Sequence, residues 1–168
     1  MVNLRRPFRL NVGFIIHEEV GYVHEFPFEF EKIKLGDDLE LREFSGVVQV
    51  DRTPQGLLVT GKFSGDTTVD CVRCLKEFNH SLVWEMTELY AFKAKSLSES
   101  ELLVPDDAQI DLEPLIREYA LLEIPISPIC KSDCKGLCPV CGQDLNETDC
   151  GHRPHEDESP FSVLKKLL

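Results

Sequence analysis

The fold is decided by a strict alternation of side-chain types in Tyr22-Val23-His24-Glu25-Phe26-Pro27-Phe28-Glu29-Phe30. Every second residue of this stretch carries an aromatic ring, and two of the residues between them are glutamates. Side chains of a β-strand point alternately to opposite faces of a sheet, so the pattern predicts a strand with one buried face. Pro27 has no amide hydrogen to donate, which favours an edge strand or a bulge over the centre of a sheet.

Two further alternating stretches extend this sheet. Between Val47 and Val72, two β-branched runs flank the turn-like Thr53-Pro54-Gln55-Gly56, so we expect a hairpin. One face of its second arm carries Leu57, Val59, Phe63, Val69 and Cys71, and the other carries Thr60, Lys62, Ser64, Asp66 and Asp70. In the next stretch, large apolar residues occupy alternate positions and would share one face of a strand: Phe78, Leu82, Trp84, Met86, Tyr90 and Phe92. The sequence therefore predicts an antiparallel sheet.

The character of the chain changes after Phe92. Residues 96–107 are polar, acidic and turn-prone, and we expect a mobile loop there. Asp111 is expected to cap a helix whose apolar residues recur at helical spacing: Leu112, Leu115, Ile116, Tyr119 and Leu122. Pro125 and Pro128 would end that helix. A short amphipathic helix is expected from Ser159 to Leu168, with Pro160 at its first helical position.

The charge of the chain restricts its partners. The 168 residues carry 18 Lys and Arg against 30 Asp and Glu, a formal net charge of −12. A protein that grips many phosphates needs a positive field, so a broadly basic nucleic-acid wrapper is excluded. The sequence also lacks a run of about 18 apolar residues, and the apolar stretch after Arg9 is short and interrupted. We therefore expect a soluble, cytoplasmic protein.

The seven cysteines have the spacing of metal ligands. Four of them, Cys130, Cys134, Cys138 and Cys141, lie within twelve residues, and Cys138-Pro139-Val140-Cys141-Gly142 is half of a tetrahedral zinc site. Cys71 and Cys74 form a second C-x2-C pair at the predicted junction of two strands, and Cys150 and His152 follow the cluster. The remaining ligands of Cys138 and Cys141 could come from Cys130 and Cys134, or from Cys134 and Cys150 with His152 in reserve. Cys71 and Cys74 could also complete a four-cysteine site across space, and the spacing leaves the partition open.

These cysteines allow three interpretations. A four-thiolate zinc site is usually closed and structural, which favours a zinc that staples the C-terminal segment. A catalytic zinc would need a vacant position and a nearby acid or base, for which Glu147, Asp149 and His152 are candidates. An exchangeable disulfide at Cys71 and Cys74 would normally open a helix in a βαβ unit, and here the pair joins strands. The sequence contains no glycine-rich phosphate loop, no G-x-S-x-G and no H-E-x-x-H motif, so we expect no catalytic residues.

The expected fold class is α+β and mainly β. It comprises an antiparallel sheet or open barrel with one helix, a small zinc-stapled C-terminal segment and a short terminal helix. We expect a β-rich domain over residues 1–95 and an acidic loop over residues 96–110. Residues 111–168 would form a helix, a cysteine-rich zinc segment and a C-terminal helix, packed as one domain with the first part.

Two ordered motifs resemble the YceD family of large ribosomal RNA subunit accumulation proteins. They are Cys71-Val72-Arg73-Cys74-Leu75 and, about sixty residues later, the segment from Pro128 to Gly142 with its K-G-L-C-P-V-C-G signature. The β-rich first half, the acidic loop and the helix before the prolines occur in the right order, so the resemblance covers about residues 22–151. The resemblance implies a role in ribosome biogenesis, in support of large-subunit (23S) ribosomal RNA, and no established reaction.

The resemblance and the charge together predict a non-enzymatic assembly factor. An acidic protein suits a basic ribosomal protein or a pre-ribosomal particle as its partner, because opposite fields speed encounter. Limited RNA contact is expected at most at the basic residues Arg5, Arg6, Arg9, Lys131 and Lys135. The alternatives are a zinc- or thiol-dependent enzyme acting on RNA or protein, and a generic zinc-binding interaction module. The expected metal ligands are Cys71, Cys74, Cys130, Cys134, Cys138, Cys141 and Cys150.

Overall fold

The computed structural model describes residues 6–92 and 102–152. The chain divides into two compact units, and each is described by itself. The sheet unit comprises Met1–Thr68 and Asn79–Ile126, and the cysteine unit comprises Val69–Phe78 and Ser127–Leu168. The helix that precedes the prolines therefore groups with the sheet. The domain boundaries at residues 95 and 110 stay a prediction.

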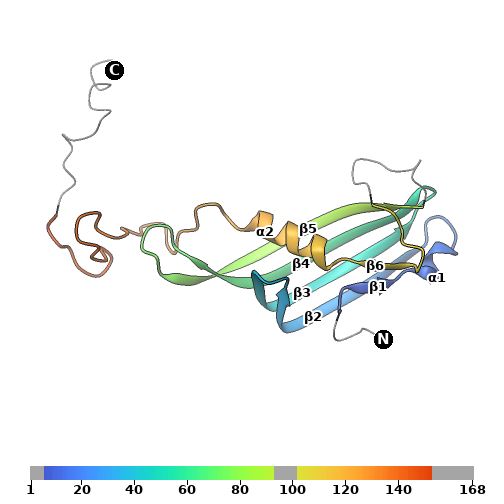
Figure 1. Cartoon of the computed structure of the whole chain (residues 1–168), viewed down its shortest axis with the longest axis horizontal. Coiled ribbons are helices and arrows are strands. Elements are labelled where there is room, and N and C mark those ends of the chain that lie inside the picture. The colour runs from blue at the N-terminus through green and yellow to red at the C-terminus, as the bar shows by residue number, and fades with distance from the viewer. Residues whose placement is uncertain (1–5, 93–101, 153–168) are drawn as a thin grey trace, which may run out of the picture. The chain divides into compact units, whose positions relative to one another are not determined.

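Four long strands form the large sheet of the protein. They are β2 (Val23–Leu35), β3 (Leu39–Arg52), β4 (Gly56–Asp70) and β5 (Glu77–Ala91), in the order β2-β3-β4-β5 (Figure 1). The predicted antiparallel sheet is confirmed, and it is open, with β2 at one edge as Pro27 indicated. The predicted hairpin turn is also present, because the amide of Thr53 donates to the Gly56 carbonyl at 2.9 Å.

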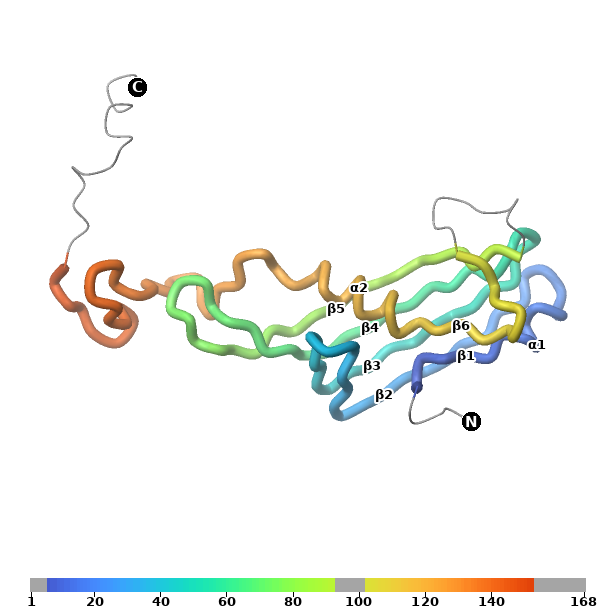
Figure 2. The backbone as a smooth tube through the Cα atoms, viewed as in Figure 1, coloured from blue at the N-terminus to red at the C-terminus, as the bar shows by residue number. Residues whose placement is uncertain are grey.

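A small second layer covers one face of the large sheet. It consists of the strand pair β1 (Arg9–Asn11) and β6 (Gln109–Asp111), the one-turn helix α1 (Gly13–Ile16) and the helix α2 (Glu113–Glu123). Figure 2 shows β1 and β6 running side by side although about a hundred residues separate them. The ring of Phe8 lies 5.1 Å from that of Phe28 and 5.6 Å from that of Phe44, so the core lies between the layers.

Most of the alternating residues predicted to face the core in β4 and β5 are buried: Leu57, Val59, Phe63, Leu82, Trp84, Met86 and Tyr90. Val69, Phe78 and Phe92, also predicted to face the core, are half-buried. On the predicted face of β2, Phe28 is buried and the other rings are half-buried. The rings of Phe63 and Trp84 stack with centroids 5.5 Å apart, which joins the two strands on the buried face. In β3 the buried side chains change from odd-numbered to even-numbered residues between Leu41 and Phe44. A β-bulge causes this change, and it includes Glu43, which has a positive φ of 48°.

The helices differ from the prediction in three ways. Apart from the helix expected at residues 159–168, the sequence predicted one helix, and the described residues contain two. The additional helix is α1, whose single turn is too short to show a helical period in the sequence. The N-cap of α2 is Leu112 and not Asp111, although the Asp111 carboxylate still accepts the Glu113 amide at 3.1 Å. Leu122 is 76% exposed, and Ala120 takes the buried position one half-turn earlier.

Two predicted segments fall partly or wholly outside the described residues. These are the acidic loop, from which residues 102–107 are described, and the terminal helix expected at residues 159–168. In the described part of the loop, Leu103 forms a bridge with Ala91. None of the helices in the described ranges is long and apolar enough to cross a membrane.

The contact between β4 and the end of β5 leaves no room at Gly56. A Cβ added there would lie 2.1 Å from the Tyr90 carbonyl oxygen, which is backbone and cannot rotate away. We expect Gly56→Ala to lower the free energy of unfolding by about 1–3 kcal/mol, the usual cost of overpacking. Urea denaturation measures the change.

The control is Gly65→Ala in the same strand, where the nearest atom to an added Cβ is 3.4 Å away. We expect that variant to lie within about 0.5 kcal/mol of the parent protein. Equal midpoints for both variants would contradict the close approach of the two strands.

Candidate metal centres

The first candidate ligands come from the loop that joins β4 to β5. The amide of Cys71 donates to the Lys76 carbonyl at 3.0 Å, and the amide of Leu75 donates to the Cys71 carbonyl at 2.8 Å. Leu75 adopts a positive φ of 59°, which tightens the turn. This turn brings Cys71 and Cys74 to the same side of the loop, so the predicted strand junction supplies two thiols.

The second pair of ligands is held against this loop by backbone hydrogen bonds. The amide of Val72 donates to the Pro128 carbonyl, and the amide of Leu137 donates to the Arg73 carbonyl, each at 3.0 Å. The Arg73 guanidinium donates to the Cys134 carbonyl at 2.9 Å. These contacts place Cys130 and Cys134 beside Cys71 and Cys74, and we call the four residues the first cluster.

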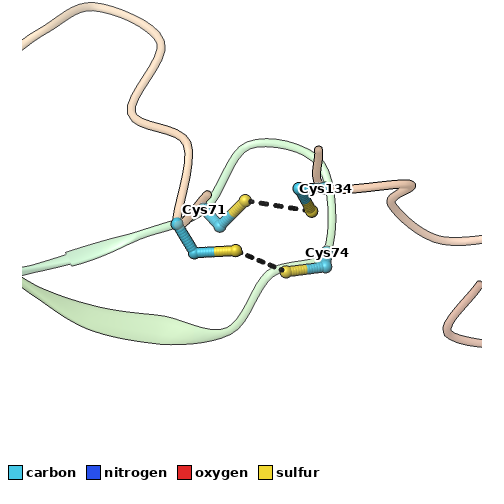
Figure 3. A group of neighbouring side chains, drawn as sticks. Cys71, Cys74 and Cys134 are labelled. Carbon is cyan, nitrogen blue, oxygen red and sulfur yellow. Dashed lines mark hydrogen bonds between the residues drawn. The ribbon is translucent and has the colours of Figure 1, made fainter. Parts of the chain in front are cut away.

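The sulfurs of the first cluster have the spacing of a tetrahedral metal site. Cys71 Sγ lies 3.8 Å from Cys134 Sγ, and Cys74 Sγ lies 3.7 Å from Cys130 Sγ. A metal bound by four sulfurs at about 2.3 Å requires neighbouring sulfurs about 3.8 Å apart, the edge of that tetrahedron. All four sulfurs lie within 4.8 Å of one another, and Figure 3 shows the labelled side chains turned toward a common centre. The first cluster therefore fits a four-coordinate ion.

A second group of ligands lies further along the chain. It consists of Cys138, Cys141, Cys150 and His152, whose ligand atoms also lie within 4.8 Å of one another, and we call it the second cluster. Its turn is closed by the Gly142 amide, which donates to the Cys138 carbonyl at 2.8 Å, and Gly142 has the positive φ of 74° that glycine tolerates. Cys138 is buried, but Cys141 and His152 are exposed.

The structure brings all seven predicted cysteines into one or other cluster. Of the arrangements that the spacing allowed, it pairs Cys71 and Cys74 with Cys130 and Cys134, and groups Cys138 and Cys141 with Cys150 and His152. His152, which the sequence suggested as an additional possible ligand, is the fourth member of the second cluster. All seven cysteines lie in the described residues, and none of them forms a disulfide. Two groups of side chains could therefore each hold one metal ion.

The electrostatics of each cluster favour one thiolate. The backbone amide of Cys130 donates toward Cys71 and lowers the pKa of that thiol to about 6. In the second cluster, the backbone amide of Cys141 lowers the pKa of Cys138 to about 6. Burial, reinforced by the neighbouring sulfurs, raises the pKa of Cys130 to about 12. At neutral pH each cluster thus offers a thiolate that can bind a cation first, and the cation then favours deprotonation of the others.

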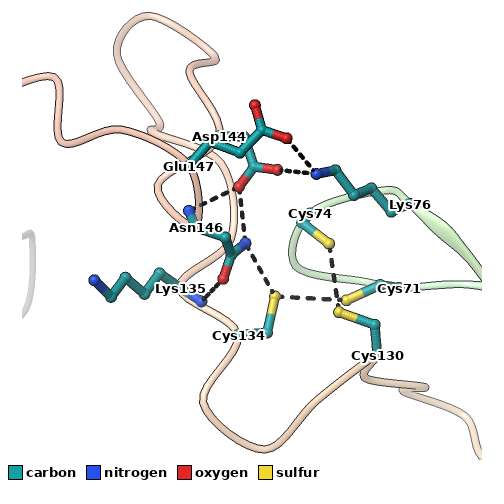
Figure 4. Close-up of polar contacts among 9 residues, drawn as sticks. All are labelled: Cys71, Cys74, Lys76, Cys130, Cys134, Lys135, Asp144, Asn146 and Glu147. Atoms are coloured by element: carbon teal, nitrogen blue, oxygen red, sulfur yellow. Dashed lines mark hydrogen bonds and ion pairs between the residues drawn. The ribbon is translucent and has the colours of Figure 1, made fainter.

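A polar network supports the first cluster, and no sequence motif indicated it. Figure 4 shows Asn146 donating its side-chain amide to Cys134 Sγ at 3.6 Å and to Asp144 at 2.8 Å, while its oxygen accepts the Lys135 amide at 2.9 Å. Lys76 pairs with Asp144 at 2.8 Å and with Glu147 at 2.7 Å. The Lys76 ammonium holds the pKa of Asp144 at about 2, so the network stays charged at neutral pH. These contacts fix the orientation of the Cys134 side chain.

Each cluster offers four candidate protein ligands. If all four bound one tetrahedral ion, no vacant position would remain for a water or a substrate. The guanidinium of Arg73, which lies between the two cysteines of the C-x2-C pair in sequence, donates to the Cys134 carbonyl at 2.9 Å. The arrangement is therefore chemically suited to holding a metal and the surrounding loops in place.

Comparisons with known proteins agree with this reading of the motifs. The family described as large ribosomal RNA subunit accumulation protein YceD matches residues 59–168, which include both clusters, and the predicted resemblance is confirmed. The uncharacterized protein Rv2926c of Mycobacterium tuberculosis is 35% identical over 170 residues, covering 98% of this chain and 77% of that protein. No solved structure matches the chain.

Two further relatives match over shorter regions. The uncharacterized protein YlbN of Bacillus subtilis is 27% identical over 107 residues, 62% of each chain. The large ribosomal RNA subunit accumulation protein YCED homolog 1, chloroplastic, of Arabidopsis thaliana is 38% identical over 63 residues, 38% of this chain and 20% of that protein.

The contact between Asn146 and Cys134 leads to a prediction about metal affinity. We expect Asn146→Ala to weaken Co²⁺ binding at the first cluster about 10- to 100-fold, the usual effect of removing a group that orients a ligand. Thiolate-to-cobalt absorption during titration measures the affinity. Glu147→Gln is the control, because Glu147 pairs with Lys76 in the same network without a contact to sulfur. Equal losses in both variants would show that the amide–sulfur contact has no separate effect.

Proposed function

The chain belongs to the YceD family, and on this premise we propose that it is a non-enzymatic ribosome biogenesis factor whose cysteine unit binds two zinc ions. In this role the protein supports accumulation of large-subunit (23S) ribosomal RNA by binding a ribosomal protein or a pre-ribosomal particle. The observation that carries the proposal is that the family match, residues 59–168, contains both clusters of metal ligands. The part of the chain that matches the family is thus the part that contains both groups of candidate metal ligands.

Zinc is the metal that this ligand chemistry favours. Thiolates are soft ligands, and four of them at tetrahedral spacing select zinc over the harder cations that prefer oxygen. Cys71, Cys74, Cys130 and Cys134 would hold one ion, and the second cluster would hold another through three sulfurs and one imidazole. When bound, the metal supplies a rigid cross-link between the segments that carry its ligands.

The absence of an enzymatic role is supported by the same sites. A catalytic zinc keeps an open position for water or substrate, whereas each cluster offers four side chains that could fill the coordination of one ion. Glu147, a candidate acid or base, is engaged by Lys76. A structural metal is therefore the better account of these residues.

Protein is favoured over naked RNA as the partner. The formal charge of −12 repels a polyanion and attracts the basic proteins of the large subunit. The basic residues near the first cluster, Lys131 and Lys135, leave room for a few phosphate contacts at most. Arg5, one of the other basic residues considered, lies outside the described residues.

Metal content tests the two-ion assignment. We expect protein purified without chelator to carry two zinc ions per chain by atomic emission. Cys74→Ser should reduce the content to one ion from the second cluster, and Cys141→Ser to one ion from the first. Ser81→Ala, at an exposed residue of β5 in the sheet unit, serves as the control and should keep both ions. Protein that contains no metal, with every thiol titratable, would refute the assignment.

The biological role has its own test. We expect the tagged full-length protein to co-sediment with precursors of the large subunit and to be absent from the small-subunit fractions. Loss of the protein should lower the ratio of 23S to 16S ribosomal RNA. An unchanged ratio, with the protein only at the top of the gradient, would contradict the proposed role.

A further inference from the structure

The outer face of the large sheet, opposite the face packed against Phe8, is left uncovered by the helices and strands of the described residues. Large apolar side chains are exposed on it, among them Val47 at 42% and Val83 at 73%. By contrast, the inner face holds the rings of Phe44, Phe63 and Trp84. A sheet of this kind normally buries one face and solvates the other, so exposed valines on the solvated face need an explanation.

These side chains line a groove of about 680 Å³, which we call the outer groove. Pro27 and Val47, which are paired across β2 and β3, contribute to it together with Val83 of β5. Ser45 and Ser64 also line it, and their short side chains are joined by a hydroxyl–hydroxyl hydrogen bond of 3.0 Å. Small polar side chains between larger apolar ones make a depression in a rigid sheet, so no rearrangement is needed to form it.

Acidic residues lie in and beside the outer groove. Glu29 lines it, and Glu25 and Asp51 lie on the same face of β2 and β3 by the alternation of the strands. The one lysine among the lining residues, Lys62, is neutralised by Glu85 at 3.1 Å. Within the described part of the chain, neither Glu25 nor Glu29 has an ion-pair partner. The groove thus combines apolar contact area with unneutralised negative charge.

We propose that the outer groove docks an extended, Lys- and Arg-rich segment of a large-subunit ribosomal protein, with an apolar side chain of that segment in the groove. The inference rests on the proposed function and names the surface and the chemistry of its partner. Opposite charge would steer the basic segment to Glu25 and Glu29, while contact with Val47 and Val83 would set the residence time. RNA fits the site poorly, because phosphates are repelled and the two aromatic residues that line it, Phe28 and Phe63, are buried.

The test uses the full chain and the proteins of the large ribosomal subunit, freed of RNA and purified separately. Surface-immobilised kinetics measure binding of each protein to the wild type, Val83→Lys and Glu29→Gln. Leu122→Lys is the matched control, because Leu122 is as exposed as Val83, at 76%, but lies on α2. We expect Val83→Lys to weaken the tightest interaction about tenfold through like-charge repulsion. Leu122→Lys should change it less than twofold, and Glu29→Gln should mainly slow association.

A photocrosslinker in place of Val83 identifies what occupies the groove in cells. The expected adduct is a Lys- and Arg-rich peptide of a large-subunit protein, absent when the crosslinker replaces Leu122. Adducts to ribosomal RNA or to a second copy of this chain would overturn the proposal, as would a Val83→Lys variant that binds like the wild type. If Val83→Lys binds like the wild type while the chain still co-sediments with large-subunit precursors, the proposed docking site is wrong. The proposed function would still stand in that case. A wild-type chain that does not co-sediment contradicts the proposed function itself.

Discussion

The convergence of four sulfurs in the first cluster is the constraint on which the cysteine unit depends. Cys71 and Cys134 are 63 residues apart in sequence, and Cys74 and Cys130 are 56 apart. Closing loops of this length costs conformational entropy that must be repaid by the contacts formed. The buried cluster of this unit consists of Cys71, Cys74 and Cys134, with Phe78 and Cys130 packed against it. So few apolar groups give little hydrophobic stabilisation, and the proposed metal–thiolate bonds would be the interaction that closes the loops.

The sheet unit is stabilised by different physics. Its core contains more than twenty buried residues from the large sheet, β1, β6 and α2, with Phe8 in contact with three other rings. Burial on this scale needs no metal. The same unit leaves its outer sheet face exposed, with apolar and acidic side chains side by side. One unit thus supplies an acidic sheet face, and the other supplies two groups of candidate metal ligands.

The sequence indicated two kinds of feature: strands whose side chains alternate over many residues, and cysteines whose spacing is typical of metal ligands. Much of the four long strands was predictable because their side chains alternate over many residues, and the ring-bearing face of β2 is a clear case. The end of β2 after Phe30 and the start of β3 before Val47 were not predicted, and the bulge in β3 interrupts the alternation there. Strands β1 and β6 were not predicted, since three residues are too few to show a period. Ala120 was missed as a core residue of α2 because alanine carries a weak apolar signal, while Leu122 attracted the prediction and lies exposed. The thiols were identifiable by type, but their partition and the contact of Asn146 with Cys134 depend on which loops the fold brings together.

The central claim is that bound metal holds the cysteine unit together. The most direct test is to remove zinc from the full-length protein and to monitor both units by their backbone amide NMR signals. The account predicts that chelation collapses the dispersed signals of Val69–Phe78 and of residues 127–152 into the random-coil region. The signals of β2, β3 and α2 should stay dispersed, and added zinc should restore the spectrum at two equivalents per chain. Dispersed signals throughout the cysteine unit after complete removal of the metal would contradict the claim that metal–thiolate bonds hold it together.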